Sequence, residues 1–312
     1  MKSKPTQPPP RFAGSQIGRL WSLASLGRYD DAILEKPPQY LLANWSSIRA
    51  FVLSRVGRYR EADRAVEAGR REAEIGENVG EQGNILLLSS LLAIEREQYG
   101  RALQDCDSAE RMFARLPEKK RRVGLVLVHL MSGIAEVRAG HIEQARQHLE
   151  MQERLVNSSV EPENWWHNAL AGEIALAAGD LGRAASAFSA GEPSRKMWWT
   201  TRYSNLSILA NNLISRDGLA RVATAQGDLA RAIQIYRQLL SYGPDQKWAS
   251  VFEPRYVLQI ARLLERSGEK QASLKETERF LNFWKRADSG LPEIADARRA
   301  VERLLPLEQA AR

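Results

Sequence analysis

One short phrase recurs along this chain and constrains its fold more than any other feature. The phrase is a Gly, a polar residue, a large apolar residue, two mostly polar residues and then Ala. Its five complete copies begin at Gly27, Gly57, Gly140, Gly179 and Gly227. Two degraded copies begin at Glu97 and at Gly268. Because a repeat of this period is typical of solenoids, the phrase predicts an array of similar units.

Each position in the phrase suits the turn of a helical hairpin. The Gly ends the first helix because it adopts the left-handed conformation at little cost. The large apolar residue anchors the turn in the core, and the Ala lets the second helix pack closely. Seven residues before most of the turn positions the first helix also carries a small residue. These residues are Ala50, Ser90, Gly133, Gly172, Ala220 and Ala261. The two small positions predict where paired helices cross.

The pattern resembles the tetratricopeptide repeat superfamily across residues 15–305. The resemblance implies an all-α fold, an α–α superhelical solenoid of about seven helical hairpins, in which each hairpin contacts mainly its neighbours. The turn positions recur every ~30 to ~48 residues, whereas the family unit has about 34. The excess predicts longer helices or longer loops. Candidate loops are residues 73–83, 157–163 and 191–194, and an additional short helix is expected near Lys196–Trp199.

The C-terminal part is similar to a narrower group. Residues 278–288 run into Leu291-Pro292-Glu293-Ile294 and then Ala297. This phrase resembles the end of tetratricopeptide arrays attached to bacterial, acidobacterial-type Ser/Thr kinases and winged-helix regulators. In that group the array is a sensory or docking appendage of an upstream signalling domain. Because no such domain is present here, we expect a truncated or free-standing appendage.

The ends of the chain and its composition complete the domain assignment. We expect residues 1–14 to be a disordered, Pro-rich lead-in and residues 306–312 to be a tail. The contents of 44% hydrophobic and 27% charged residues are those of a soluble globular protein. The formal charge is +7, but 38 acidic residues are interspersed with 45 basic ones. We therefore do not expect nucleic acid as the main partner.

Cysteine usage and hydropathy predict a cytoplasmic protein without a membrane segment. Cys106 is the single cysteine, so no internal disulfide can form. No apolar segment of a secretory signal follows Lys2 and Lys4. The longest apolar runs are too short to span a bilayer.

The sequence lacks the motifs that would carry catalysis. It has no kinase Gly-rich loop, no His-Arg-Asp or Asp-Phe-Gly motif and no phosphate-binding GxxxxGK[ST] loop. No two histidines have the spacing of three or four residues that places a metal-binding pair on one helix face. Cys106 falls at a packing position, which predicts a buried, inert thiol. We therefore expect no enzyme activity, no cofactor and no metal.

The first helix of each hairpin should line the concave face, which is the expected partner site. The candidate residues are Arg221, Arg255, Arg262, Arg266, Trp166, Glu173, Arg138, Phe51 and Asn44. Our hypothesis is an acidic or carboxylate-bearing peptide, with Arg pairing bidentately and Trp stacking. The alternative is that the arginines form salt bridges across hairpins with Glu173 or Glu265.

Two further groups of residues could contribute. Adjacent helical residues point about 100° apart, so one Trp of Trp165–Trp166 and of Trp198–Trp199 is expected to be exposed. The basic cluster is Lys119, Lys120, Arg121 and Arg122. We interpret this cluster as the solvated start of a helix, and contact with phosphate or an acidic surface is the alternative. The sequence thus favours a protein-binding scaffold in bacterial signalling or regulation. The competing interpretation is a regulatory or nucleic-acid-contacting module of a transcription factor or kinase whose effector domain is on another chain.

Overall fold

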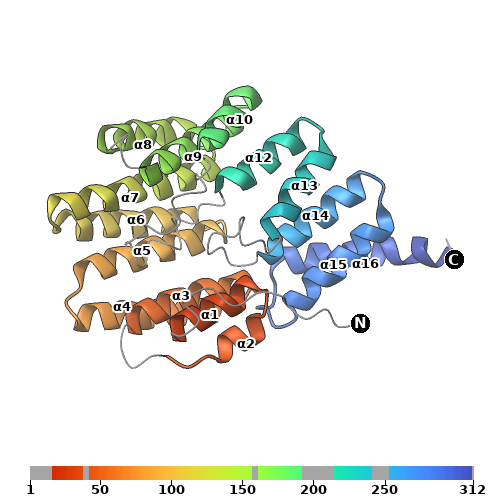
Figure 1. Ribbon diagram of the computed structural model, residues 1–312, viewed down its shortest axis with the longest axis horizontal. Helices are drawn as coiled ribbons and strands as arrows, with labels where there is room; N and C mark the ends of the chain where they lie inside the picture. The colour runs from red at the N-terminus through yellow and green to blue at the C-terminus, as the bar shows by residue number, and fades with distance from the viewer. Residues whose placement is uncertain (1–15, 38–41, 157–160, 192–213, 241–252, 311–312) are drawn as a thin grey trace.

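The computed structural model describes residues 16–37, 42–156, 161–191, 214–240 and 253–310, and within these ranges it contains helices and no strand (Figure 1). Consecutive helices pair into hairpins. The pairs are α1 (Gln16–Ser25) with α2 (Tyr29–Leu34), α3 (Leu42–Arg55) with α4 (Tyr59–Ile75), α5 (Val79–Ile94) with α6 (Tyr99–Ala114), α7 (Glu118–Ala139) with α8 (Ile142–Leu155), α9 (Glu161–Ala177) with α10 (Leu181–Ala190), α12 (Ile214–Ala225) with α13 (Leu229–Leu240), and α14 (Pro254–Arg266) with α15 (Lys270–Phe283). A further helix, α16 (Pro292–Ala310), packs against α15 and runs past the boundary expected at residue 305. The predicted all-α superhelical solenoid of about seven hairpins is confirmed.

The turns are built as the repeated phrase predicts. All six turn glycines have positive φ, from 71° at Gly27 to 85° at Gly268. Glu97, which takes the Gly position in a degraded copy, adopts the same region with φ 60°. The residue after each turn position donates its N–H to a carbonyl in the last helical turn, as Arg58 does to Leu53 at 3.1 Å. These bonds satisfy carbonyls that the end of the helix would leave unpaired.

The small positions lie where helices cross. The six Ala residues that end the phrase are fully buried: Ala32, Ala62, Ala102, Ala145, Ala184 and Ala232. Gly172 of α9 faces the ring of Phe188, and a Cβ placed on this glycine would lie 2.6 Å from the ring. A larger residue would separate α9 from α10, so the close approach depends on the glycine.

Longer helices account for part of the excess repeat length. The longest of the paired helices, α7, has 22 residues. The prediction of a loop over residues 73–83 is wrong, because α4 continues to Ile75 and α5 already begins at Val79. Residues 157–160, residues 192–194 and the expected extra helix near Lys196–Trp199 lie outside the described part of the chain.

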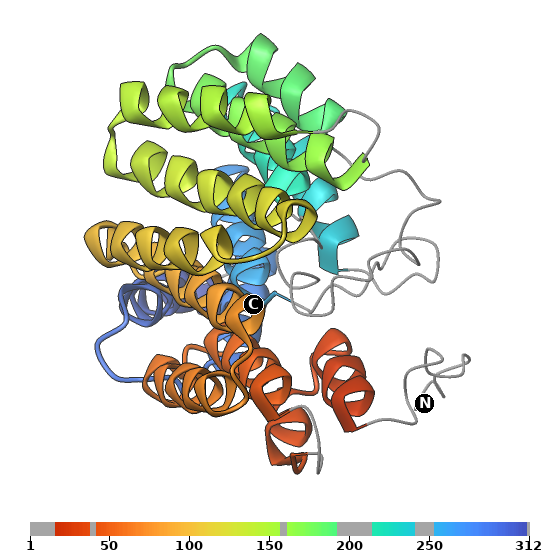
Figure 2. The ribbon, with the colours of Figure 1, turned by 90° about the vertical axis from the view of Figure 1, so that its left-hand side faces the viewer.

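The two ends of the described array meet, as Figures 1 and 2 show for the helices at the two ends of the colour range. Trp284, at the end of α15, is 2% exposed and donates its indole Nε1–H to the carbonyl of Arg55 at 2.9 Å. The amide of Asp288 donates to the carbonyl of Gly57 at 3.0 Å. In return, the carboxylate of Asp288 accepts the amide of Arg60 at 2.8 Å. We call this contact between the first hairpins and α14–α16 the junction.

The junction has an apolar core of its own. Buried side chains of α1–α5 and of α14–α16 belong to one cluster, which includes Leu53, Val257 and Phe280. The expectation that each hairpin contacts mainly its neighbours is therefore wrong at the ends of the array. The concave face is not an open groove there, because the last hairpin packs back on the first ones.

Candidate partner-binding surface

A buried ion-pair ladder links three successive hairpins. Glu173 of α9 is 2% exposed and binds the guanidinium of Arg221 of α12 through both carboxylate oxygens. Arg138 of α7 approaches the same carboxylate at 3.4 Å. Burial opposes ionisation of Glu173, but Arg221 and Arg138 outweigh it and lower its pKa. Arg221 and Glu173 therefore form the inter-hairpin salt bridge that the sequence left as the alternative.

A second network of charged groups holds the junction together. Arg55 of α3 pairs with Glu95, at the end of α5, and with Glu253, which precedes α14. Arg255 pairs with the same Glu95 at 3.4 Å and donates to the hydroxyl of Tyr59. Burial would raise the pKa of Glu95, but the two arginines overcome this effect and lower it. Arg255 is thus committed to joining the two ends.

The aromatic candidates are packed into the fold. Phe51 stacks on Trp21 with ring centroids 6.1 Å apart, and the guanidinium of Arg55 lies 4.4 Å from the centre of its ring. Trp165 and Trp166 are 6% and 1% exposed. The expectation that one of this pair is exposed is wrong, because α9 is in contact with α7, α8, α10 and α12. Trp166 therefore has no face available for stacking on a partner.

Asn44 is half-buried on α3, and its side-chain carbonyl accepts no hydrogen bond within the described residues. The other tryptophan pair, Trp198–Trp199, lies outside the described residues.

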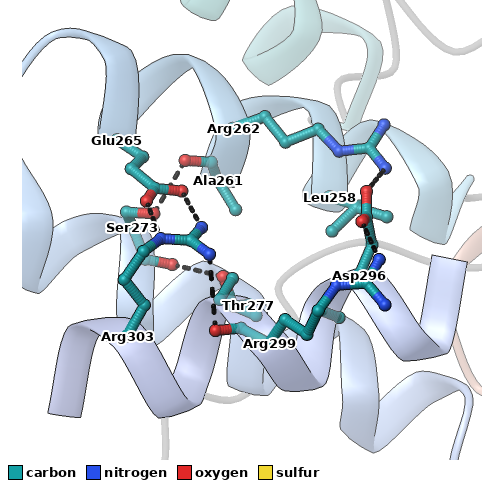
Figure 3. Close-up of a pocket in the computed structure, with 11 residues that line it drawn as sticks. Leu258, Ala261, Arg262, Glu265, Ser273, Thr277, Asp296, Arg299 and Arg303 are labelled. Carbon is teal, nitrogen blue, oxygen red and sulfur yellow. Dashed lines mark hydrogen bonds and ion pairs between the residues drawn. The ribbon is translucent and has the colours of Figure 1, made fainter.

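Arg262 and Arg266 are the candidate arginines that stay most accessible on α14. Arg262 donates to the carboxylate of Asp296 on α16 at 2.7 Å, and Arg299 donates to the other oxygen of that carboxylate at 2.6 Å. Figure 3 shows the two guanidinium groups meeting on Asp296. These hydrogen bonds lower the pKa of Asp296, so it remains ionised. Arg266 is exposed, and no ion pair to it occurs within the described ranges.

Two pockets adjoin this Arg262–Asp296–Arg299 group. The larger, of about 560 Å³, opens at the junction and we call it the junction pocket. Tyr59 and the turn formed by residues 95–98 line one side, and Arg255, Arg262 and Arg299 line the other. The smaller pocket, of about 80 Å³, has the buried Ser273 and Thr277 in its lining. In Figure 3 the bidentate pair of Arg303 with Glu265, at 2.8 and 3.0 Å, stands across this pocket from Asp296.

The basic cluster lies in the first turn of α7. Lys119, Lys120 and Arg121 are exposed. Arg122 is half-buried and donates to the carbonyl of Leu155 at 3.0 Å. The exposure agrees with the interpretation of a solvated helix start.

One feature that sequence reasoning missed is a pair of histidines on α7 and α8. The Nδ1 atoms of His129 and His148 lie 3.2 Å apart. Burial and the neighbouring His148 lower the pKa of His129 to about 4. The signal was present, because the two residues lie on the two helices that flank the turn at Gly140, 11 residues before it and 8 after it, but a search for helical i, i+4 spacing overlooks it.

The structure also places the single thiol and the groups that could bind a metal. Cys106 is buried, its Sγ lies 3.1 Å from the hydroxyl of Ser90, and burial raises the pKa of the thiol to about 11. Within the described ranges no group of three His, Cys, Asp or Glu side chains is placed to hold a metal ion. Nor does any helix in those ranges have the length and apolarity needed to cross a membrane.

Comparison with known proteins found similarity among solved structures and none among family models or curated sequences. No protein-family model matches it, and no curated protein sequence does. Among solved structures it is similar to a chain in the crystal structure of the APC/C hetero-tetramer Cut9–Hcn1, with a TM-score of 0.48 and 14% sequence identity. The match covers 93% of this chain and 48% of that chain, so this chain spans about half the length of the other.

Proposed function

We propose that this chain is a non-catalytic scaffold that binds a protein or peptide partner with acidic side chains. The observation that carries the proposal is the Arg262–Asp296–Arg299 group. Each guanidinium has five N–H donors, and the ion pair with Asp296 uses few of them. Arg262 and Arg299 are 41% and 63% exposed at the edge of a pocket, so their remaining donors are accessible to a partner's carboxylate.

The other predicted residues have supporting parts in this proposal. Arg138, Arg221 and Glu173 hold three hairpins in register, and Arg255 and Phe51 hold the junction. Arg266 extends the basic surface of α14 toward solvent. The partner thus contacts α14 and α16, while the interior networks keep those helices in place.

We also propose a cytoplasmic signalling role. The support is the resemblance of residues 278–297 to arrays joined to bacterial kinases and winged-helix regulators. A partner of this kind is a signalling protein on another chain, and the scaffold brings it to its site of action.

Capture from the native cell extract tests the proposal. The purified chain is compared with an Arg262→Ala/Arg266→Ala variant and with an Arg71→Ala/Arg146→Ala control, which removes two exposed arginines from other surfaces. The wild-type chain and the control should capture the same partner from the extract, and the Arg262→Ala/Arg266→Ala variant should not capture it. Equal capture by all three proteins would reject α14 as the contact surface.

The exposed Lys119, Lys120 and Arg121 support one competing function, in which the chain contacts nucleic acid. Binding of a duplex DNA that weakens steeply as salt rises would favour that function, because each phosphate contact releases a counterion. Loss of that binding in a variant with all three residues replaced by Ala would locate the contact on α7.

A further inference from the structure

We infer that the junction pocket takes the acidic segment of the partner only while the two ends of the array are docked, so that partner binding and closure of the array stabilise each other. This inference rests on the proposed function and names the regulation of the same site. Three observations support it: which residues form the pocket, which of them have unused N–H donors, and which contacts join the two sides.

The two sides of the junction pocket come from opposite ends of the chain. Tyr59 and residues 95–98 belong to the second and third hairpins, whereas Arg255 and Arg262 belong to the last hairpin and Arg299 to α16. No segment of the chain contributes to both sides. If the ends separate, each side becomes an ordinary helix surface and the pocket no longer exists.

The free donors of the pocket lie on the C-terminal side. Arg96 on the opposite side already uses three of its five N–H donors, because it binds both oxygens of Asp63 at 2.8 and 2.9 Å and the carbonyl of Leu92 at 3.0 Å. Arg262 and Arg299 keep donors, and the carboxylate they share belongs to the protein itself. A carboxylate of the partner can bind the remaining donors beside Asp296 or take its place, and in either case both guanidinium groups stay paired.

The size of the pocket fits a short extended segment. Its volume of about 560 Å³ lies within the range of pockets that enclose small ligands. The lining also includes the carboxylates of Glu95 and Glu293, which are both paired with Arg255, and that of Glu97. An acidic segment that reaches Arg262 and Arg299 from inside this pocket faces Tyr59 and Gln98 on the other side. The partner therefore has more contacts with the closed form than with the open one.

A ligand that favours one of two states must shift the equilibrium toward that state. Two amides report closure directly, because the amide of Asp288 donates to the carbonyl of Gly57 and that of Arg60 donates to the carboxylate of Asp288. Both bonds break when the ends separate. The amide of Asp180, which donates to Ala175 in the turn between α9 and α10, is a matched control away from the junction.

The experiment measures hydrogen exchange of these three amides in the full chain, with and without a hexaglutamate peptide. At a peptide concentration of ~30 times its Kd, exchange at Asp288 and Arg60 should slow by about 30-fold, and exchange at Asp180 should not change. An Arg262→Ala/Arg299→Ala variant should show neither peptide binding nor slowing. Hexaglutamine is the uncharged control.

Two outcomes overturn the inference. One is hexaglutamate binding that leaves the exchange of Asp288 and Arg60 unchanged, since binding would then be independent of closure. The other is no binding of hexaglutamate to the wild-type chain. The proposed function fails separately, when capture of the cellular partner does not depend on Arg262 and Arg266.

Discussion

At the scale of single residues, Asp296 has an unusual position for a surface carboxylate. It lies between Arg262 and Arg299 and is 48% exposed. Exposed ion pairs of this kind contribute little to stability, about 0–1 kcal/mol each. Its effect on recognition is larger, because an internal carboxylate competes with any external one for the same two guanidinium groups.

Replacing Asp296 with Asn should therefore tighten the binding of hexaglutamate by about 5- to 10-fold, which corresponds to ~1 kcal/mol. Fluorescence anisotropy of labelled peptide measures the change. Glu302→Gln is the matched control, because it removes one negative charge from an exposed position on the same helix. Equal or weaker binding by the Asp296 variant would mean that Asp296 orients the arginines and does not compete with the ligand.

The histidine pair makes stability depend on pH. One Nδ1 can donate to the other only while at least one ring is neutral, and protonating both would place two positive charges in contact. The pKa of His129 is about 4, below the ordinary value of 6.5. The unfolded chain therefore takes up this proton first, and stability is lost as pH falls from 6.5 toward 4.

Between pH 7 and pH 5 the free energy of unfolding, measured in urea, should fall by about 2 kcal/mol more in the wild type than in a His129→Leu variant. Burial also lowers the pKa of the neighbouring His148. The negative charges of Glu136, Glu110 and Asp107 favour its protonation but do not offset the effect of burial. Exposed His141, replaced by Gln, serves as the control and should follow the wild type. Parallel pH profiles for wild type and the His129 variant would show that the pair does not control acid stability.

At the scale of helices, the repeated phrase was sufficient to predict the hairpins. Each turn depends on residues that are close in sequence, and even Glu97 adopts the left-handed conformation of the glycine it replaces. What lies on each face of a helix was harder to predict. Trp165 and Trp166 are both buried because α9 is covered on several sides by helices from three hairpins, which no local pattern reveals.

The crossing of α9 and α10 offers a test of the small positions. A Gly172→Ala change places a Cβ 2.6 Å from the fully buried ring of Phe188, so the ring or the helix must move. We expect a loss of about 1–3 kcal/mol in the free energy of unfolding, measured in urea. Gly100→Ala is the control, because a Cβ there meets nothing within 4 Å and should be neutral or stabilising.

At the scale of the whole molecule, the contact between the two ends of the array could not be predicted from the sequence. Whether the last hairpin meets the first depends on the small rotations of all the hairpins added together, and the sequence fixes none of them accurately. The same limit applies to the site. Arg262 and Arg266 could be chosen by counting back from a turn, but Asp296 and Arg299 lie on α16, outside the counted repeat. The sequence therefore identified one of the two arginines that bind Asp296, and two residues of the pocket lining, Arg255 and Arg262, but not the pocket that they help to form.

Trp284 tests closure without touching the pocket. A Trp284→Phe change keeps an aromatic ring but removes the donor to the carbonyl of Arg55, at a cost of about 1–3 kcal/mol for the buried acceptor. Hydrogen exchange should accelerate together at Arg60 and Asp288, although these residues are far apart in sequence. Trp165→Phe, another buried position, should leave both rates unchanged. Acceleration at only one of the two amides would argue against a single closing contact.

The meeting of the two ends also bears on how such a protein can evolve. An open array tolerates duplication or deletion of a hairpin, since only the adjoining units are affected. Here the same event would displace α15 by a full unit and carry Trp284 away from its acceptor on α3. Selection therefore acts on the number of hairpins as a whole, and lineages that keep this arrangement should differ in the lengths of their connections while the count of their units stays constant.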